Sequence, residues 1–218
     1  MLKKIVACLT LAGALTGCSK VPSGYVGVKV YLLGGTKGVD HEVLGVGRYW
    51  IGINEELYLF PTFQQNYVWT KSADEGSPND ESITFQTREG MTVNTDVGIT
   101  YSVDPQKVDT IFQKYRRGIV EITDVFLRNQ VRDTINAVAS NMSVEDVYGN
   151  GKVKMMDEVQ RQVRALVDPI GILVEKIYLI NEMRLPANVV EALNQKIGAT
   201  QKAQQRENEL RQAEAEAK

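Results

Sequence analysis

The chain of 218 residues has few of the residue types on which catalytic and metal sites usually depend. Its two cysteines are Cys8 and Cys18, so the body of the protein carries no thiol for a disulfide framework or a thiolate metal site. A single histidine, His41, argues against a histidine-dependent triad and a multi-histidine metal centre. We interpret His41 as an exposed or capping residue of a glycine-rich loop.

Two common nucleotide and acyl-transfer motifs are also missing. The sequence contains neither a G-x-x-x-x-G-K-[ST] phosphate loop nor a G-x-S-x-G nucleophile elbow. The acidic pairs Asp74/Glu75 and Glu145/Asp146 fall in predicted turns or helix starts, where carboxylates are usually solvated or act as caps. A hydrolase would need carboxylates that converge from distant positions. We therefore expect no enzyme activity, no metal, and no cofactor other than a covalent lipid.

Neither sign of charge is in marked excess. The 25 lysine and arginine residues face 27 aspartate and glutamate residues, which gives a formal net charge of -2. A phosphate backbone attracts proteins mainly through clustered basic residues, so we do not expect a nucleic-acid partner.

No apolar run is long enough to remain as a membrane span. Residues 3–4 are lysines, and the apolar segment 5–15 that follows has about a dozen residues, against the roughly 20 that a transmembrane helix needs. A positive start, a short apolar core and small residues are typical of a secretory signal. A buried helix with an incidental cysteine is the alternative, but such a helix would normally show a polar face.

The end of this run is the sequence Leu-Thr-Gly-Cys at residues 15–18, which resembles the bacterial lipobox. The resemblance implies cleavage between Gly17 and Cys18, removal of residues 1–17 as a signal peptide, and attachment of lipid, such as palmitate, to Cys18. Several acyl chains on one cysteine hold a protein far better than a single chain, at about 0.8 kcal/mol per buried CH₂.

The segment 18–23 is predicted to be a lipid-anchored tether. Six extended residues reach only about 20 Å, so the folded body would sit against the bilayer. Ser19 follows the lipidated position, where aspartate in Gram-negative lipoproteins tends to mean retention in the inner membrane. We therefore expect a bacterial envelope protein that faces the periplasm, with the outer membrane slightly favoured over the inner.

The sequence pattern of the body changes from strand-like to mixed along the chain. Residues 24–90 are predicted to form a β-rich part, with a glycine-turned hairpin over 83–101 as its clearest pattern. Residues 91–185 are predicted to be mixed α/β. Asp104-Pro105 starts a helix, Ser143 with Asp146 makes a capping-box-like start to a short turn, 153–167 has helical spacing of apolar residues, and 172–180 is predicted to be a strand that returns to the sheet. The expected fold class is α+β.

Residues 186–218 are rich in alanine, glutamine and glutamate and are predicted to form one helix of about 48 Å. Its first half carries an apolar stripe, whereas its second half has no apolar face, so we expect it to be solvated or packed side by side in an oligomer. No C-cap signal occurs at Lys218, so we expect the helix to continue in a longer parent protein. The predicted oligomerisation residues are Val190, Leu193, Ile197 and Leu210.

Several stretches are similar to the SPFH or Band 7 family of stomatins, prohibitins and flotillins: TFQTREGMTVNTDVGITYSVDP, IFQKYRRG, VRDTINAVASNMSVEDVY and the segment 171–204, with GVGRYWIGI and LYLFPT on the prohibitin side. The resemblance runs from about Gly24 to Ala203. It implies a domain in two parts followed by a long helix, assembly of many copies into membrane-bound rings or cages, and control of membrane proteins such as proteases. Most relatives use a membrane helix or hairpin, whereas this chain offers Cys18.

Two groups of residues are candidates for membrane contact. Aromatic and apolar residues favour the interface, and the short tether brings Trp50, Ile51, Phe60 and Phe63 close to it, although core packing is the commoner fate of such residues. Arg116 and Arg117 are candidates for binding lipid headgroups or a neighbouring subunit. A solvated helix terminus explains these two arginines equally well.

Two functions follow from this sequence. The first is a lipid-anchored membrane scaffold that self-assembles into large rings or cages. The alternative is a periplasmic adaptor or inhibitor of one envelope enzyme, as a monomer or small oligomer. The mass of the native particle separates the two hypotheses.

Overall fold

The computed structural model describes residues 17–34 and 37–216, so nearly all of the predicted signal peptide lies outside the described residues. The strands are β1 (Cys18–Val21), β2 (Tyr25–Tyr31), β3 (Gly38–Leu44), β4 (Gly47–Trp50), β5 (Glu55–Pro61), β6 (Gln65–Trp69), β7 (Ile83–Gln86), β8 (Thr92–Thr95), β9 (Val97–Val103) and β10 (Ile172–Leu179). The helices are α2 (Val108–Tyr115), α3 (Ile119–Glu121), α4 (Arg128–Ala139), α5 (Val144–Tyr148), α6 (Gly151–Val167) and α7 (Ala187–Glu216). Short helical turns are η1 (Pro105–Lys107), η2 (Ile122–Leu127) and η3 (Asp168–Ile170).

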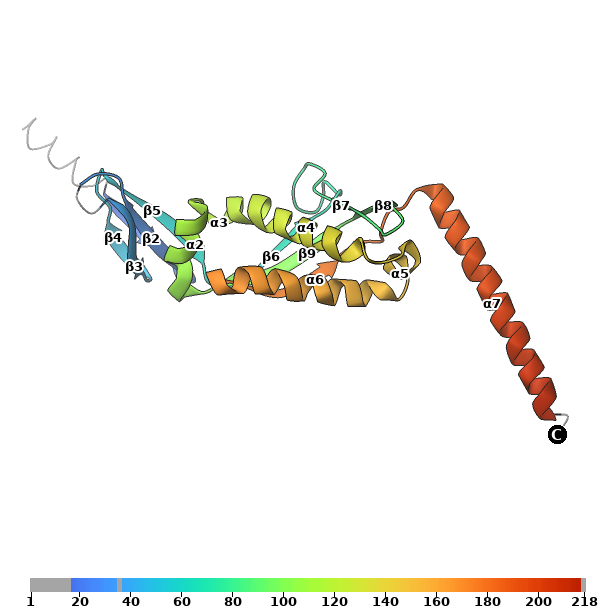
Figure 1. Cartoon of the computed structure of the whole chain (residues 1–218). Coiled ribbons are helices and arrows are strands. Elements are labelled where there is room, and N and C mark those ends of the chain that lie inside the picture. The colour runs from blue at the N-terminus through green and yellow to red at the C-terminus, as the bar shows by residue number, and fades with distance from the viewer. Residues whose placement is uncertain (1–16, 35–36, 217–218) are drawn as a thin grey trace, which may run out of the picture.

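These elements form a β-rich part and a mixed part, which confirms the predicted α+β class. The β-rich part contains the antiparallel sheet β3-β2-β5 and the two-stranded ribbon β1-β4. The mixed part contains the antiparallel sheet β10-β9-β6 and the hairpin β7-β8, covered by α4 and α6. Figure 1 shows the ribbon and the first sheet at one end of the molecule and α7 leaving the other.

The chain passes from the first sheet to the second between Pro61 and Gln65. This change lies earlier than the expected boundary at residues 90 and 91, which falls inside the β7-β8 loop. The expected hairpin forms, with Ile83 opposite Thr95 and Gly90 at φ 75° in its turn. Its second strand ends at Thr95, however, and after Asp96 the strand β9 pairs with β6 and β10 instead.

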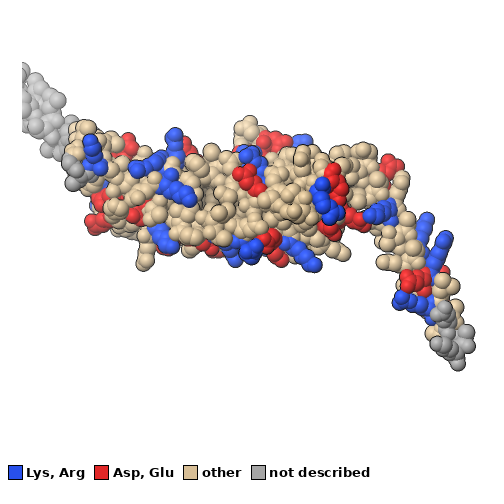
Figure 2. Space-filling model, in the orientation of Figure 1, with Lys and Arg blue, Asp and Glu red and all other residues tan. Residues whose placement is uncertain are grey.

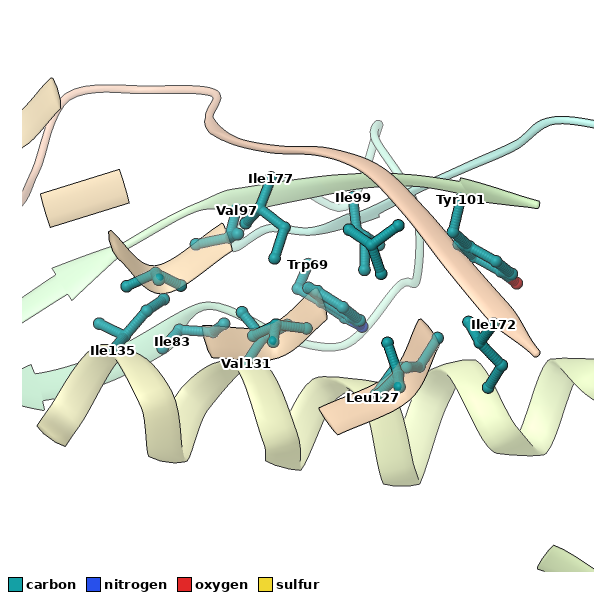
Figure 3. Close-up of a cluster of buried hydrophobic side chains, with 14 of the residues drawn as sticks. Trp69, Ile83, Val97, Ile99, Tyr101, Leu127, Val131, Ile135, Ile172 and Ile177 are labelled. Atoms are coloured by element: carbon teal, nitrogen blue, oxygen red, sulfur yellow. The ribbon is translucent and has the colours of Figure 1, made fainter. Parts of the chain in front are cut away.

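The largest side chain in the core is Trp69, which is fully buried. Figure 3 shows Trp69 between the strand residues Val97 and Ile99 and the helical residues Leu127 and Val131. The helical side reaches this cluster through η2, a π-helical turn. A π-helical turn spaces successive contacts by five residues, so Ile122 and Leu127 both face the core, whereas Val120 remains 67% exposed.

Two predicted helix starts have the expected caps. The Asp104 side chain accepts a hydrogen bond from the Gln106 backbone N–H, with Pro105 as the first residue of η1. The Ser143 hydroxyl accepts from the Asp146 N–H at the start of α5. Each satisfies a backbone donor that the first helical turn leaves without a partner.

The helix α7 has 30 residues and is therefore about 45 Å long. Its first turns contact the body, where Leu193 is buried and Lys196 Nζ lies 2.6 Å from Glu145 Oε2. Every described side chain from 199 onward is exposed. Figure 2 shows lysine, arginine, aspartate and glutamate interspersed along the body and along α7. Within the described ranges, no helix is both long enough and apolar enough to cross a membrane.

Candidate membrane-facing site

The segment predicted to be a tether begins with a paired strand. β1 runs antiparallel to β4, with Cys18 opposite Trp50 and Val21 opposite Gly47. Val21 is fully buried, and its Cγ2 atom lies close to Gly27 of β2. The ladder extends one residue further, because the Ile51 N–H donates to the Gly17 carbonyl at 2.7 Å. Cys18 is thus held by the sheet itself rather than by a free linker.

The outward surface of this ribbon consists of Cys18, Lys20, Arg48 and Trp50, which we call the ribbon face. All four are exposed, whereas their neighbours Ser19, Val21 and Tyr49 are half-buried or buried. Successive side chains of a strand alternate between faces, and directly opposite residues share one. The register therefore places Lys20 beside Arg48 and Cys18 beside Trp50 on a single surface.

Large apolar side chains are exposed at the Cys18 end of the ribbon. Trp50 is 60% exposed, Ile53 is fully exposed, and Leu33 is 65% exposed. The turn after β4 brings these residues together, since the Leu32 N–H donates to the Asn54 carbonyl at 2.7 Å. We call Leu32, Leu33, Trp50 and Ile53 the apolar tip. Aromatic and aliphatic side chains in such a position suit the membrane interface.

The four predicted membrane contacts have different environments. Trp50 belongs to the apolar tip, and Ile51 beside it is half-buried. Phe60 is fully buried and packs edge-on against Phe112, with ring centroids 6.5 Å apart, so its assignment to the membrane was wrong. Phe63 is 49% exposed, but it lies beyond the Pro61 end of β5 and contacts Tyr25. It is therefore separated from the apolar tip by the length of β5, roughly 20 Å.

Arg116 and Arg117 have local partners at the end of α2. Arg116 adopts φ 54°, its N–H donates to the Phe112 carbonyl, and its Nε donates to the Gln113 carbonyl. Arg117 lies 3.6 Å from Glu121 in an exposed pair. These contacts agree with the interpretation of the arginines as a helix terminus.

Other titratable residues are distributed along the surface. His41 lies in β3, not in a loop, and is 80% exposed with its Nδ1 3.2 Å from Asp109 Oδ2. Asp146, in the first turn of α5, accepts a hydrogen bond from the hydroxyl of the N-cap residue Ser143, and Glu145 pairs with Lys196 at the surface. Among residues 17–34 and 37–216, no group of three or more histidine, cysteine, aspartate or glutamate residues could hold a metal ion.

One ion pair, between the buried Asp96 and the partly exposed Arg184, connects the second sheet to the segment before α7. The carboxylate of Asp96 is 2% exposed and accepts two hydrogen bonds from the Arg184 guanidinium, at 2.8 and 2.7 Å. Asn181 Nδ2 and the Lys71 N–H donate to the same carboxylate. The bonds from Arg184 and Asn181 lower the pKa of Asp96 to about 2. Backbone hydrogen bonds between Asn94 and Arg184 join this pair in holding the segment before α7 against β8.

The four predicted oligomerisation residues differ in how exposed they are. Leu193 is buried against its own body, so it does not belong to the free surface of α7, which corrects that assignment. Val190 is half-buried, whereas Ile197 is 40% exposed and Leu210 is 66% exposed. The exposed part of α7 therefore presents a polar surface with isolated apolar residues.

A groove of about 660 Å³ lies beside β10 and is lined by Tyr148, Met156, Tyr178, Ile180 and Met183, among others. β10 pairs only with β9 among the described strands, so it is an edge of its sheet. Part of this edge is covered, because Arg164 donates to the Val174 carbonyl and the Ile177 N–H donates to Gln160 Oε1. The sequence does not predict this groove, since its residues come from α5, α6, β10 and the segment that follows β10.

The ribbon face also went unnoticed in the sequence. Lys20 and Arg48 are 28 positions apart and only the pairing of two four-residue strands brings them together. Glycines within and around β4 make its sequence more typical of a loop than of a strand. Asp96 and Arg184 leave no clearer trace, because Asp96 stands at a polar position of the alternation over residues 83–101.

Comparison with known proteins gave one family. The family model described as "SPFH domain / Band 7 family" matches residues 19–217, almost the whole chain after Cys18. No curated protein matches the chain.

Proposed function

The chain belongs to the SPFH domain / Band 7 family, a family of membrane-associated scaffolds, and from this premise we propose that it is a lipid-anchored scaffold subunit of a bacterial envelope. In this proposal Cys18 carries the lipid, the body stands on the membrane through its β-rich end, and many copies assemble into a ring or cage. The assembly organises membrane proteins, such as proteases, and has no catalytic role of its own.

The observation that carries this proposal is the position of Cys18. It is exposed on a paired strand at the end of the molecule opposite α7, next to the apolar tip. Lipid on Cys18 would hold this end at the bilayer, with Trp50 at the level of the headgroups. The exposed part of α7 would then extend away from the membrane, where copies of the chain can pack side by side.

We place the protein on the periplasmic side, because a cleaved lipobox precedes an exported chain. Ser19 at the position after Cys18 favours the outer over the inner membrane. Ser19 is half-buried on the inward side of β1. In this proposal it therefore contributes to the packing of the ribbon as well as to the choice between inner and outer membrane.

Lipid attachment is tested by metabolic labelling with an alkyne analogue of palmitate, followed by mass spectrometry of the N-terminal peptide. We expect the wild-type chain to carry label on a peptide that begins at Cys18. A Cys18→Ser variant should lose the label, whereas Cys8→Ser, which changes the cysteine in the removed segment, should keep it. An unlabelled wild-type chain that retains residues 1–17 would rule out this anchor.

One observation favours the second candidate function, that of an adaptor for an envelope enzyme. The groove beside β10 offers apolar side chains next to a strand edge that Arg164 and Gln160 cover only in part, a surface to which an extended segment of another protein can add. The adaptor would act as a monomer or a small oligomer. The size of the native particle therefore distinguishes the two functions.

A further inference from the structure

We propose that the ribbon face binds the headgroups of anionic lipids through Lys20 and Arg48, so that the body docks flat on a negatively charged membrane. This inference rests on the proposed lipid attachment at Cys18. It assigns a ligand to two basic residues that form no ion pair with any residue of the ranges 17–34 and 37–216.

The geometry of the ribbon puts the charged and the lipidated positions in one plane. Lys20 and Arg48 are directly opposite each other, one strand step of two residues away from the Cys18–Trp50 pair. Two residues of a strand span about 7 Å, and opposite Cβ atoms are about 5 Å apart. A lipid that holds Cys18 at the bilayer surface therefore also holds Lys20 and Arg48 within reach of the headgroups.

The charges on this face are not balanced within the described residues. Neither Lys20 nor Arg48 takes part in an ion pair there, whereas nearby Lys29 lies 3.5 Å from Glu55. Two like charges directly opposite each other destabilise an antiparallel pair. An anion between them would remove this repulsion, and a phosphate group accepts both the forked hydrogen bonds of arginine and those of lysine.

Three neighbouring features identify the anion as part of a bilayer. Cys18 lies on the same face, Trp50 is the aromatic side chain that favours the interface most clearly, and Ile53 of the apolar tip is fully exposed. The chain as a whole carries a formal net charge of -2, so general electrostatics would repel it from an anionic surface. Attraction must then come from local basic residues such as this pair.

Trp50 provides the measurement, because the only other tryptophan, Trp69, is fully buried. The full-length lipidated protein is inserted into vesicles of phosphatidylcholine, with or without phosphatidylglycerol, and quenching of tryptophan fluorescence by brominated acyl chains is recorded. A Trp50→Phe variant supplies the background. Each basic residue near an anionic surface should shift the ratio of docked to undocked protein about five-fold.

We expect stronger quenching of Trp50 in vesicles with phosphatidylglycerol. The double variant Lys20→Gln/Arg48→Gln should lower the ratio of docked to undocked protein about 25-fold and abolish the dependence on anionic lipid. The matched control, Lys202→Gln/Arg206→Gln, removes the same charge from exposed positions of α7 and should behave as wild type.

Equal quenching in both kinds of vesicle, or an equal loss in both double variants, would overturn the inference. Such a result leaves the anchor intact, because lipidated protein still floats with neutral vesicles. Failure of the proposed anchor has a different signature: the wild-type protein would not float with neutral vesicles and its N-terminal peptide would carry no lipid.

Discussion

Replacing Arg184 by methionine is expected to lower the free energy of unfolding by about 3–5 kcal/mol, because the substitution leaves a buried carboxylate without its counter-charge. Asp96 is 2% exposed and takes two of its hydrogen bonds from Arg184. Methionine preserves much of the side-chain volume but donates no hydrogen bond. Denaturant unfolding of the two proteins measures the difference.

The control is Arg161→Met, which breaks the Arg161–Glu158 pair on the exposed surface of α6. Surface ion pairs contribute little, so this variant should unfold at nearly the wild-type denaturant concentration. Similar losses of unfolding free energy in both variants would mean that the Asp96–Arg184 pair stabilises the fold no more than an exposed ion pair does. In that case the segment before α7 would be held by its other contacts, which include the backbone hydrogen bonds between Asn94 and Arg184.

A second measurement on the same pair uses pH. The pKa of Asp96 in the folded protein is lowered to about 2 from its usual 3.8. The carboxylate therefore stabilises the fold fully above about pH 4 and loses this contribution as pH falls towards 2. An Asp96→Asn variant lacks the titrating group, so the difference in unfolding free energy between wild type and variant should shrink over this range.

Replacing Gln204 by proline is expected to reduce the native particle to a monomer or small oligomer while the body remains folded. Proline in a helix interior costs about 3 kcal/mol and breaks the hydrogen-bond ladder. Gln204 is exposed and lies beyond Leu193 and Lys196, the contacts that dock α7 on the body. The melting temperature of the body should therefore barely change. Particle mass and thermal unfolding are measured on the same sample.

The matched control is Gln204→Ala, which keeps the helix and should keep the particle mass. If Gln204→Pro assembles as wild type does, subunits associate through the body and not through α7. Loss of both particle mass and body stability would also contradict the account, because it would make α7 part of the core.

Local sequence signals predicted most of the fold. Alternation over residues 83–101 predicted the β7-β8 hairpin, and the capping residues Asp104 and Ser143 marked two helix starts that the structure confirms. These features depend on neighbours within a few positions, so composition and spacing are enough to find them. Membership of the family followed from motif order along the whole chain.

Features that depend on distant contacts were missed. Alternation continues through Asp96, yet the chain leaves one sheet for another there, because Arg184 supplies a partner 88 positions later. The π-helical turn η2 could not be expected either, since a spacing of five between Ile122 and Leu127 fits no regular helix. Pairing of β1 with β4 likewise needs the folded first sheet as its support.

Exposure was the least predictable property of the candidate site. Trp50 and Phe60 both lie in aromatic stretches, but Trp50 ends an outer strand, whereas Phe60 lies in β5 beside β2 and packs against α2. Leu193 and Ile197 both belong to the apolar stripe of α7, and only Leu193 reaches the body. In each pair, the exposure of the side chain depends on where another element of the fold packs. The spacing of apolar residues along a strand or a helix carries no information about that packing.

The central claim, a lipid-anchored scaffold of many copies, is tested most directly by the mass of the native particle. The full-length protein is extracted in mild detergent and measured by mass photometry, together with the Cys18→Ser variant. We predict a particle many times heavier than the 24.3 kDa chain for the wild type, with assembly weakened when the lipid no longer concentrates the subunits. A wild-type particle of one to a few chains would contradict the scaffold and leave the adaptor as the function that the structure supports.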